Sequence, residues 1–208
     1  MAAPRIHPSA IVEPGVQIGD DTAVWDNVHV RAGARIGREC IVGEKTYVAS
    51  RVIIGDQVKI NSHVYVCSGV TIEDRVMVAA GAIFTNDRYP RAFDPHTGRL
   101  ATSEATADTL HTTVRAGATI GAGVLIGPGV EIGSYAMVGM GAVVVSDVPP
   151  HGLVYGNPAR LHGSVCMCGT PLMAAAGAAA GFDCPRCGRA LVAPRQADVA
   201  HPDRAGVA

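Results

Sequence analysis

Aromatic residues, net charge and long apolar runs are all scarce in this 208-residue sequence. Phe, Trp and Tyr together make up 4%, so the core is not built on large rings. The formal net charge of −1 provides no basic field for nucleic acid or for an anionic membrane. The longest smooth apolar run, residues 173–181, is too short to span a bilayer, and residues 1–13 contain no signal-peptide-like stretch. We therefore expect a cytoplasmic protein that binds neither nucleic acid nor membrane.

What the sequence does contain is a six-residue repeat. Large apolar residues recur every six positions at Ile6, Val12, Ile18, Val24, Val30, Ile36, Val42, Val48, Ile54, Ile60, Val66, Ile72, Val78 and Phe84, and again at Val114, Ile120, Ile126, Ile132, Val138 and Val144. A period of six fits neither a helix nor an alternating strand. It fits short strands separated by tight turns, three to a triangular coil, so we predict an all-β parallel β-helix of roughly six to seven coils.

Two further positions of the hexad are restricted. The residue four places after each large apolar residue is small or β-branched, as in Ala34 and Val58, and is predicted to fill the corner of the coil. Gly often follows the large apolar residue directly, as at Gly19, Gly37 and Gly55. We expect these glycines to supply the backbone dihedrals of the turns.

The repeat lapses between Phe84 and Val114, which predicts a loop insertion over residues 85–113. Long loops in an otherwise regular solenoid are usually functional or disordered. The first part, Thr-Asn-Asp-Arg-Tyr-Pro-Arg at residues 85–91, is rich in polar side chains and proline. We therefore place the candidate active site in this first part of the loop.

These residues resemble a known family, the hexapeptide-repeat acyltransferases, over residues 6–163. Parallel crossovers are usually right-handed, and the resemblance implies the left-handed exception. Residues 84–90, Phe-Thr-Asn-Asp-Arg-Tyr-Pro, resemble the loop motif of sugar-nucleotide N-acetyltransferases, nearest those that acetylate the 3-amino group of a UDP-linked 2-acetamido-3-amino uronic acid. The resemblance implies acetyl-CoA as co-substrate, a nucleotide-sugar substrate in surface-polysaccharide or glycan biosynthesis, and a homotrimer with active sites between subunits.

The resemblance also implies that Asn86 is the main catalytic-site residue, which holds the acceptor amine. His111, at the end of the loop, is the general-base candidate by its place in the chain, although the departing thiolate can accept the proton instead. Asp87, Arg88 and Arg91 are predicted to bind substrate, because Arg pairs well with a diphosphate or a carboxylate. The alternatives are a turn-forming asparagine, an exposed loop histidine and ordinary surface charge.

The last coils carry a second family-like segment, Gly-Asn-Pro-Ala-Arg at residues 156–160. By resemblance, Asn157 and Arg160 are predicted to contact CoA, and Gly121 and Gly139 are predicted to bring backbone close to it. The alternative is that the prolines around this segment only terminate the solenoid.

After Arg160 the composition changes, and two cysteine pairs follow. Cys166 and Cys168, then Cys184 and Cys187, each precede a glycine and look like the two knuckles of a zinc ribbon. We predict a zinc-ribbon-like module over residues 164–192, with structural Zn²⁺ held by four thiolates, after a β-helix domain of residues 1–163. Residues 193–208 are predicted to be a disordered tail. Disulfides or free thiols are the alternatives, and a reducing compartment disfavours disulfides.

Two other functions share the predicted fold. A γ-class carbonic anhydrase needs three metal-binding histidines on adjacent coils, and His63 is the only histidine between His29 and His96. A non-catalytic scaffold would use the solenoid faces for partners and would not require the loop motif. Binding of acetyl-CoA separates an enzyme from a scaffold.

Overall fold

The computed structural model describes residues 1–102, 105–106, 109–172 and 182–191. The predicted tail, residues 193–208, and the Ala-rich residues 174–181 lie outside the described part. The described residues form short strands and turns with no helix, and therefore contain no helix long and apolar enough to cross a membrane. The all-β class predicted from the hexads is confirmed.

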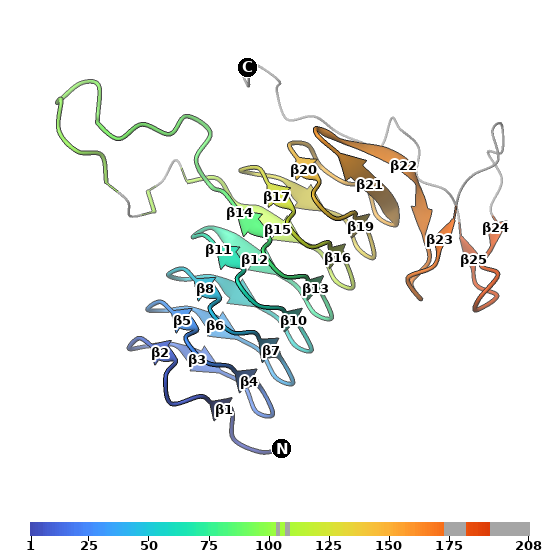
Figure 1. Cartoon of the computed structure of the whole chain (residues 1–208), viewed down its shortest axis with the longest axis horizontal. Helices are drawn as coiled ribbons and strands as arrows, with labels where there is room; N and C mark the ends of the chain where they lie inside the picture. Colours follow the sequence, from blue (N-terminus) through green and yellow to red (C-terminus); the bar gives the residue numbers. More distant parts are fainter. Residues whose placement is uncertain (103–104, 107–108, 173–181, 192–208) are drawn as a thin grey trace.

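The strands stack as a triangular prism with three parallel sheets (Figure 1). The first sheet, called sheet A, contains β1 (Arg5–Ile6), β4 (Ala23–Val24), β7 (Ile41–Val42), β10 (Lys59–Ile60), β13 (Met77–Val78), β16 (Thr119–Ile120), β19 (Met137–Val138), β21 (Gly152–Gly156), β22 (Ala159–Val165) and β23 (Pro171–Leu172). Its strands from β1 to β21 run parallel, whereas β22 and β23 are antiparallel additions.

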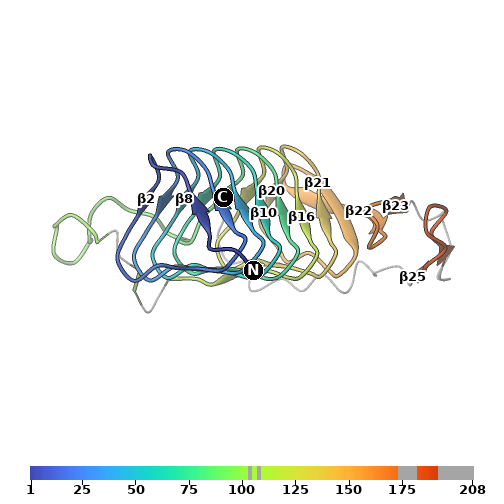
Figure 2. The ribbon, with the colours of Figure 1, turned by 90° about the horizontal axis from the view of Figure 1, so that it is seen from below.

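The other two sides of the prism are shorter sheets. Sheet B contains β2 (Ile11–Val12), β5 (His29–Val30), β8 (Tyr47–Val48), β11 (Tyr65–Val66), β14 (Ile83–Phe84), β17 (Leu125–Ile126) and β20 (Val143–Val144). Sheet C contains β3 (Gln17–Ile18), β6 (Arg35–Ile36), β9 (Ile53–Ile54), β12 (Val70–Ile72), β15 (Thr112–Val114) and β18 (Glu131–Ile132). Viewed from below, the coils follow one another along a single axis (Figure 2).

The register of the sheets explains the repeat. Away from the insertion and the last coil, each strand residue pairs with the residue 18 positions later, as Lys59 does with Met77, so one coil contains three hexads. The hexads predicted six to seven coils, and the structure adds one because β21 stacks on β19 out of phase with the repeat. After Val144, the next core residue is Val148, four positions later, which bridges to Ile132.

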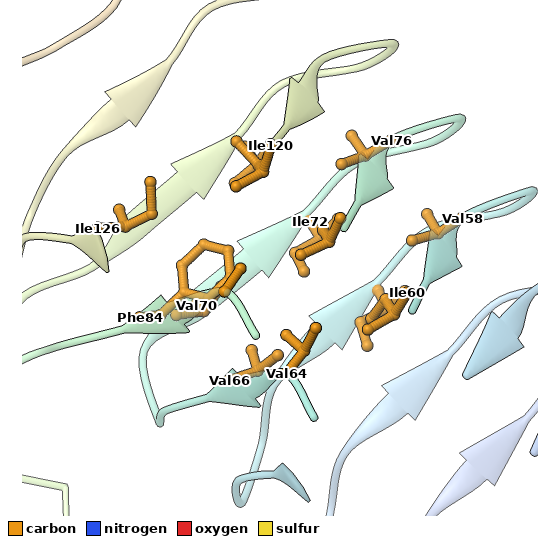
Figure 3. Close-up of a cluster of buried hydrophobic side chains, with 14 of the residues drawn as sticks. Val58, Ile60, Val64, Val66, Val70, Ile72, Val76, Phe84, Ile120 and Ile126 are labelled. Carbon is orange, nitrogen blue, oxygen red and sulfur yellow. The ribbon is translucent and has the colours of Figure 1, made fainter. Parts of the chain in front are cut away.

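The main core is a column of side chains inside the prism (Figure 3). The large hexad residues form its axis, and Ile60, Ile72 and Ile120 are fully buried. The fourth residues of the hexads, such as Ala34 and Val58, are buried at the corners as predicted. Burial of this apolar surface is the main source of stability, at about 25 cal/mol per Å².

The expected role of the glycines is wrong. Neither Gly19 nor Gly55, which directly follow a core residue, has a positive φ. Instead, a Cβ at Gly19 would lie 2.7 Å from the backbone N of Arg38, in the next coil. Positive φ values recur six residues apart at other corner positions, and many of these carry side chains, such as Asp21 and Arg51. Gly19 and Gly55 therefore allow the coils to stack closely, because a Cβ at either position would meet backbone of the next coil.

The insertion leaves the prism between sheets B and C. Ile83 pairs with Leu125, a separation of 42 rather than 18, so the insertion adds 24 residues to one coil. In both views the loop projects away from the coils (Figures 1 and 2). Part of it is a small hairpin in which Asp94 N–H donates to the Arg99 carbonyl at 2.8 Å and Phe93 bridges to Leu100.

Sheet B presents an apolar and aromatic stripe to the outside. Its outward side chains are Ile11, His29, Tyr47, Tyr65, Ile83, Leu125 and Val143. Tyr47 and Tyr65 stack with their ring centroids 5.2 Å apart. At the start of the stripe, Glu13 accepts the Ala32 N–H at 2.9 Å and contacts His29 Nε2 at 2.9 Å. These hydrogen bonds, the backbone one first, lower the pKa of Glu13 to about 2.

Candidate active site

The two ends of the loop meet at one corner of the prism, which we call the loop base. It consists of Asn86, Leu110, Thr112 and the Ser68–Gly69 corner of the preceding coil. Leu110 N–H donates to the Asn86 carbonyl at 3.3 Å, and Thr112 N–H donates to the Gly69 carbonyl at 3.0 Å. The loop base is therefore closed by hydrogen bonds, although the chain between its ends leaves the prism.

Asn86 is half-buried, and the coil below fixes its side chain. Its Nδ2 donates to the Ser68 carbonyl at 2.9 Å, where Ser68 lies 18 residues earlier. Thr85, beside it, donates from Oγ1 to the Ile126 carbonyl of the coil above at 3.0 Å. With Nδ2 directed at Ser68, the Oδ1 atom of Asn86 is the acceptor that the amide can offer to a ligand.

His111 follows Leu110 directly and is exposed. Its backbone therefore begins at the loop base, one residue from the partner of Asn86. Among the described residues, no hydrogen bond or ion pair fixes its imidazole. The structure thus brings the two catalytic candidates to the same corner, with Asn86 oriented and His111 free to turn.

The predicted substrate-binding residues lie in the first turn of the loop. The Asp87 carboxylate accepts the Tyr89 N–H at 2.9 Å, which shapes this turn. Arg88 is half-buried, whereas Arg91 is exposed and donates from Nη1 to the neighbouring Pro90 carbonyl at 2.9 Å. Asp87 and Arg88 thus adjoin Asn86, and Arg91 lies further along the loop. Their roles in substrate binding stay predictions.

The two glycines predicted to contact CoA both have a packing reason to be glycine. A Cβ at Gly121 would lie 2.7 Å from the Met140 backbone N, and one at Gly139 would lie 2.8 Å from the Cβ of Tyr155. They occupy equivalent positions in successive coils, after β16 and β19. Their contact with CoA stays a prediction, because close coil stacking explains both residues without a ligand.

Asn157 and Arg160 lie at the hairpin between β21 and β22. Both are exposed, and Arg160 donates from Nη1 to the Ala159 carbonyl at 3.0 Å. Beside them, Tyr155 and His162 stack with ring centroids 3.6 Å apart. This aromatic pair was not predicted, because the two residues meet only when β21 and β22 pair antiparallel.

Comparison with known proteins assigns the fold to a family. The sequence profile of the family described as bacterial transferase hexapeptide (six repeats) matches residues 15–50, 51–86 and 111–146. These segments make up more than half of the chain, and the gap between the last two falls on the loop. The chain belongs to the bacterial hexapeptide transferase family.

Individual relatives of this hexapeptide transferase match it over a short segment or at low sequence identity. A curated dTDP-3-amino-3,6-dideoxy-alpha-D-galactopyranose 3-N-acetyltransferase of Aneurinibacillus thermoaerophilus is 53% identical over 34 residues, which span 16% of this chain and 18% of that protein. A Bacillus cereus crystal structure, assigned as an acetyltransferase, is 23% identical with a TM-score of 0.50, and the match covers 76% of each chain. This similarity confirms the β-helix fold.

A further solved structure is PerB from Caulobacter crescentus, in complex with CoA and GDP-perosamine. It is 25% identical with a TM-score of 0.41, and the match covers 77% of this chain and 57% of PerB. The hexapeptide transferase thus spans less than two thirds of that protein's length.

The C-terminal cysteines of this hexapeptide transferase converge on one point. The Sγ atoms of Cys166, Cys168, Cys184 and Cys187 all lie within 4.8 Å of one another. Cys166 and Cys187 are 3.5 Å apart and Cys168 and Cys184 are 3.6 Å apart, too far for disulfides. Four thiolates on a tetrahedral ion with bonds of about 2.3 Å would lie about 3.8 Å apart. The group can therefore hold a metal ion.

The first knuckle is continuous with the solenoid. The predicted boundary at residues 163–164 falls inside β22, and β23 of the knuckle pairs with β22 in sheet A. Val165 N–H donates to the His151 carbonyl at 2.8 Å, which ties the knuckle to the last coil. Near the thiols, the Thr170 hydroxyl lies 3.2 Å from Cys168 Sγ, and hydrogen bonds from this hydroxyl, from the Thr170 backbone and with the neighbouring thiols lower the pKa of Cys168 to about 6. The second knuckle carries β24 (Phe182–Asp183) and β25 (Ala190–Leu191).

Proposed function

We propose that this hexapeptide transferase is an acetyl-CoA-dependent N-acetyltransferase that acts on an amino group of a nucleotide-linked sugar. The observation that carries the proposal is the orientation of Asn86. Its Nδ2 is directed at the Ser68 carbonyl, so Oδ1 is available to accept a hydrogen bond from an acceptor amine at the loop base. The residues around it, Phe84 to Pro90, are those that resemble the sugar-nucleotide N-acetyltransferases.

The reaction needs few groups from the protein. The neutral amine attacks the thioester carbonyl of acetyl-CoA, a C–N bond forms, and a tetrahedral oxyanion develops. Asn86 Oδ1 orients the lone pair of the amine by accepting one of its N–H groups. Backbone N–H groups of the coils stabilise the oxyanion. When the C–S bond breaks, the CoA thiolate leaves, and the amine proton passes to His111 or to that thiolate.

For the substrate, we propose a 3-amino sugar linked to UDP, used in surface-polysaccharide or glycan biosynthesis. The loop motif supports the 3-amino position, and the relative from Aneurinibacillus thermoaerophilus is named for a dTDP-linked 3-amino sugar. Arg88 and Arg91 are the groups we assign to the diphosphate or to a sugar carboxylate. Gly121, Gly139, Asn157 and Arg160 are assigned to CoA.

We also propose a homotrimer. The loop carries large apolar side chains without cover from its own coils, since Phe93 is 52% and Leu100 is 86% exposed. The outward stripe of sheet B adds Tyr65 and Leu125, which are 44% and 42% exposed. Packing of copies through sheet B would bury this stripe and give the protruding loop a partner surface.

For the cysteine group, we propose structural Zn²⁺. The spacing of the Sγ atoms fits a tetrahedral tetrathiolate, and four protein ligands leave no open position for catalysis. A tetrathiolate zinc site carries two negative charges, and the knuckles supply two arginines, Arg186 and Arg189, close in sequence to its ligands. Arg186 Nη1 lies 3.4 Å from the Cys168 carbonyl. Reduced thiols of this kind suit the cytoplasmic location predicted from the sequence.

The test of the function is thiol release from acetyl-CoA with UDP- and dTDP-linked 3-amino and 4-amino sugars. Release with one acceptor is expected, and Asn86→Ala should lower its rate by about 100-fold or more while the fold and the oligomer persist. Asn61→Ala is the control: Asn61 directly follows β10 of sheet A, in the coil before that of Asn86, and its loss should leave the rate unchanged. If the protein binds CoA but releases no thiol with these sugars, the acceptor is a different compound. If it does not bind CoA, the alternative of a non-catalytic scaffold is favoured.

A further inference from the structure

The loop base raises the question of what holds Asn86 in place. Its side chain is held from below by the Ser68 carbonyl, and its own carbonyl is held by Leu110 N–H. Leu110 in turn lies directly over Gly69. The three segments therefore depend on how closely the returning end of the loop can approach the Ser68–Gly69 corner.

That approach is possible only without a side chain at position 69. A Cβ on Gly69 would lie 2.8 Å from the Leu110 carbonyl oxygen and 3.3 Å from Cγ2 of Thr109. A carbon that close to a backbone oxygen is inside the repulsive range, so the backbone of Leu110 would have to move. Thr112 N–H, which donates to the Gly69 carbonyl at 3.0 Å, limits the direction of that movement.

A positive φ is not what distinguishes Gly69 from the other corners of the same column. Gly69 has a φ of +86°, but the equivalent corner one coil earlier is Arg51, with a full side chain and a φ of +60°. The corner before that is Gly33, with a φ of +73°, where an added Cβ would meet only the flexible Arg51 side chain at 3.4 Å. Positions 33 and 69 therefore share a corner and a positive φ, and they differ in what lies above them.

We infer that Gly69 is a positioning residue for the proposed transfer reaction. The lack of a side chain lets Leu110 close over the corner, which keeps the Asn86 carbonyl bonded and its amide directed at Ser68. His111 is carried to the same place because it follows Leu110. This inference rests on the proposed function only for its effect on rate, since the closure of the loop base is a property of the fold.

The experiment compares Gly69→Ala with Gly33→Ala, which adds the same methyl at the same kind of corner. Gly69→Ala should lower kcat by about tenfold or more, because displacements of well under 1 Å already weaken a positioned group. The KM for acetyl-CoA should change by less than about twofold. Gly33→Ala should leave both values near those of the parent. Equal loss of kcat in the two variants would overturn the inference.

A double variant separates positioning from general damage. If Gly69 acts through Asn86, then Gly69→Ala should have little further effect on kcat in the Asn86→Ala background. Independent, multiplying losses would show that Gly69 does not act through Asn86.

A readout without activity keeps the inference testable if the proposed function fails. Hydrogen exchange of residues 109–114 reports on the Leu110 and Thr112 amides, which are protected at the loop base. Exchange should accelerate in Gly69→Ala and not in Gly33→Ala. Should Gly69→Ala not fold, Asn86→Ala must accelerate exchange of the same segment, because it removes the bond to Ser68. Unchanged exchange in a folded Gly69→Ala, or in Asn86→Ala, refutes the positioning role, whereas an inactive parent refutes only the acetyltransferase.

Discussion

The regular coils and the loop of this hexapeptide transferase differ in how their residues are paired and buried. In the coils, most strands pair with a strand 18 residues away in the sequence, and side chains such as Ile60 and Ile126 are almost completely buried. In the loop, Tyr89 and Leu100 are 65% and 86% exposed, and the two ends of the loop are bonded to the prism at the loop base. Stability therefore belongs to the coils, while the proposed chemistry depends on a few bonds at one corner.

The sharpest way to separate the two regions is to remove the loop tip. Residues 88–108 are replaced by a short Gly-Ser linker, which retains Asn86 and His111. We expect transfer to fall by about 100-fold or more, because the proposed substrate contacts of Arg88 and Arg91 are lost. The melting temperature should stay within about 3 °C of the parent, since the core is untouched. Retained turnover would show that the loop does not hold substrate.

The opposite test keeps the loop and removes a core side chain from the strand immediately before it. Phe84 is fully buried in the core (Figure 3), and Phe84→Ala should destabilise the fold by about 3–5 kcal/mol through lost burial and a cavity. Denaturant unfolding measures this loss. The matched control is Ile83→Ala, the next residue back, whose side chain is 40% exposed on the outside of sheet B. A similar loss in both variants would mean that the inward column is not the main source of stability.

Removal of the metal from the cysteine group tests whether the C-terminal knuckles unfold independently of the coils. Chelation of the metal, or Cys184→Ser, should unfold the knuckles while the melting temperature of the coils falls by no more than about 5 °C. Metal content measured by elemental analysis should fall from about one zinc per chain to none. Cys67→Ser, a buried cysteine outside the group, should keep the metal. Four freely titrating thiols in metal-supplemented protein would rule out the zinc site.

The smallest expected effect concerns the charge network at the start of sheet B. The pKa of Glu13 is about 2 in the fold against an ordinary 4.5, so its contribution to stability is present above pH 4.5. That contribution is lost as the pH falls from 4.5 towards 2. Glu13→Gln should therefore lower the melting temperature at pH 7 by no more than about 3 °C and flatten its dependence on acid pH. Glu44→Gln is the control, and an identical acid profile for both variants would contradict the assignment.

Most of the fold could be predicted because its rule is local and repeated. The hexad marks which residue of each strand faces the core, and the lapse after Phe84 marks where the loop leaves. The grouping of the four cysteines was likewise predictable from their spacing, since each pair is nearly adjacent in sequence. The last coil was not predictable in detail, because β21 joins the stack out of phase with the hexads.

The sequence by itself determined the coils, the place of the loop and the candidate residue Asn86. Only the tertiary structure decided what Asn86 bonds to, why Gly69 is glycine, and why Gly19 and Gly55 have no side chains. The physical reason is the same in each case. A hexad gives the direction of a side chain within its own coil, whereas steric and hydrogen-bonding limits come from backbone 18 or more residues away, which only stacking brings into contact.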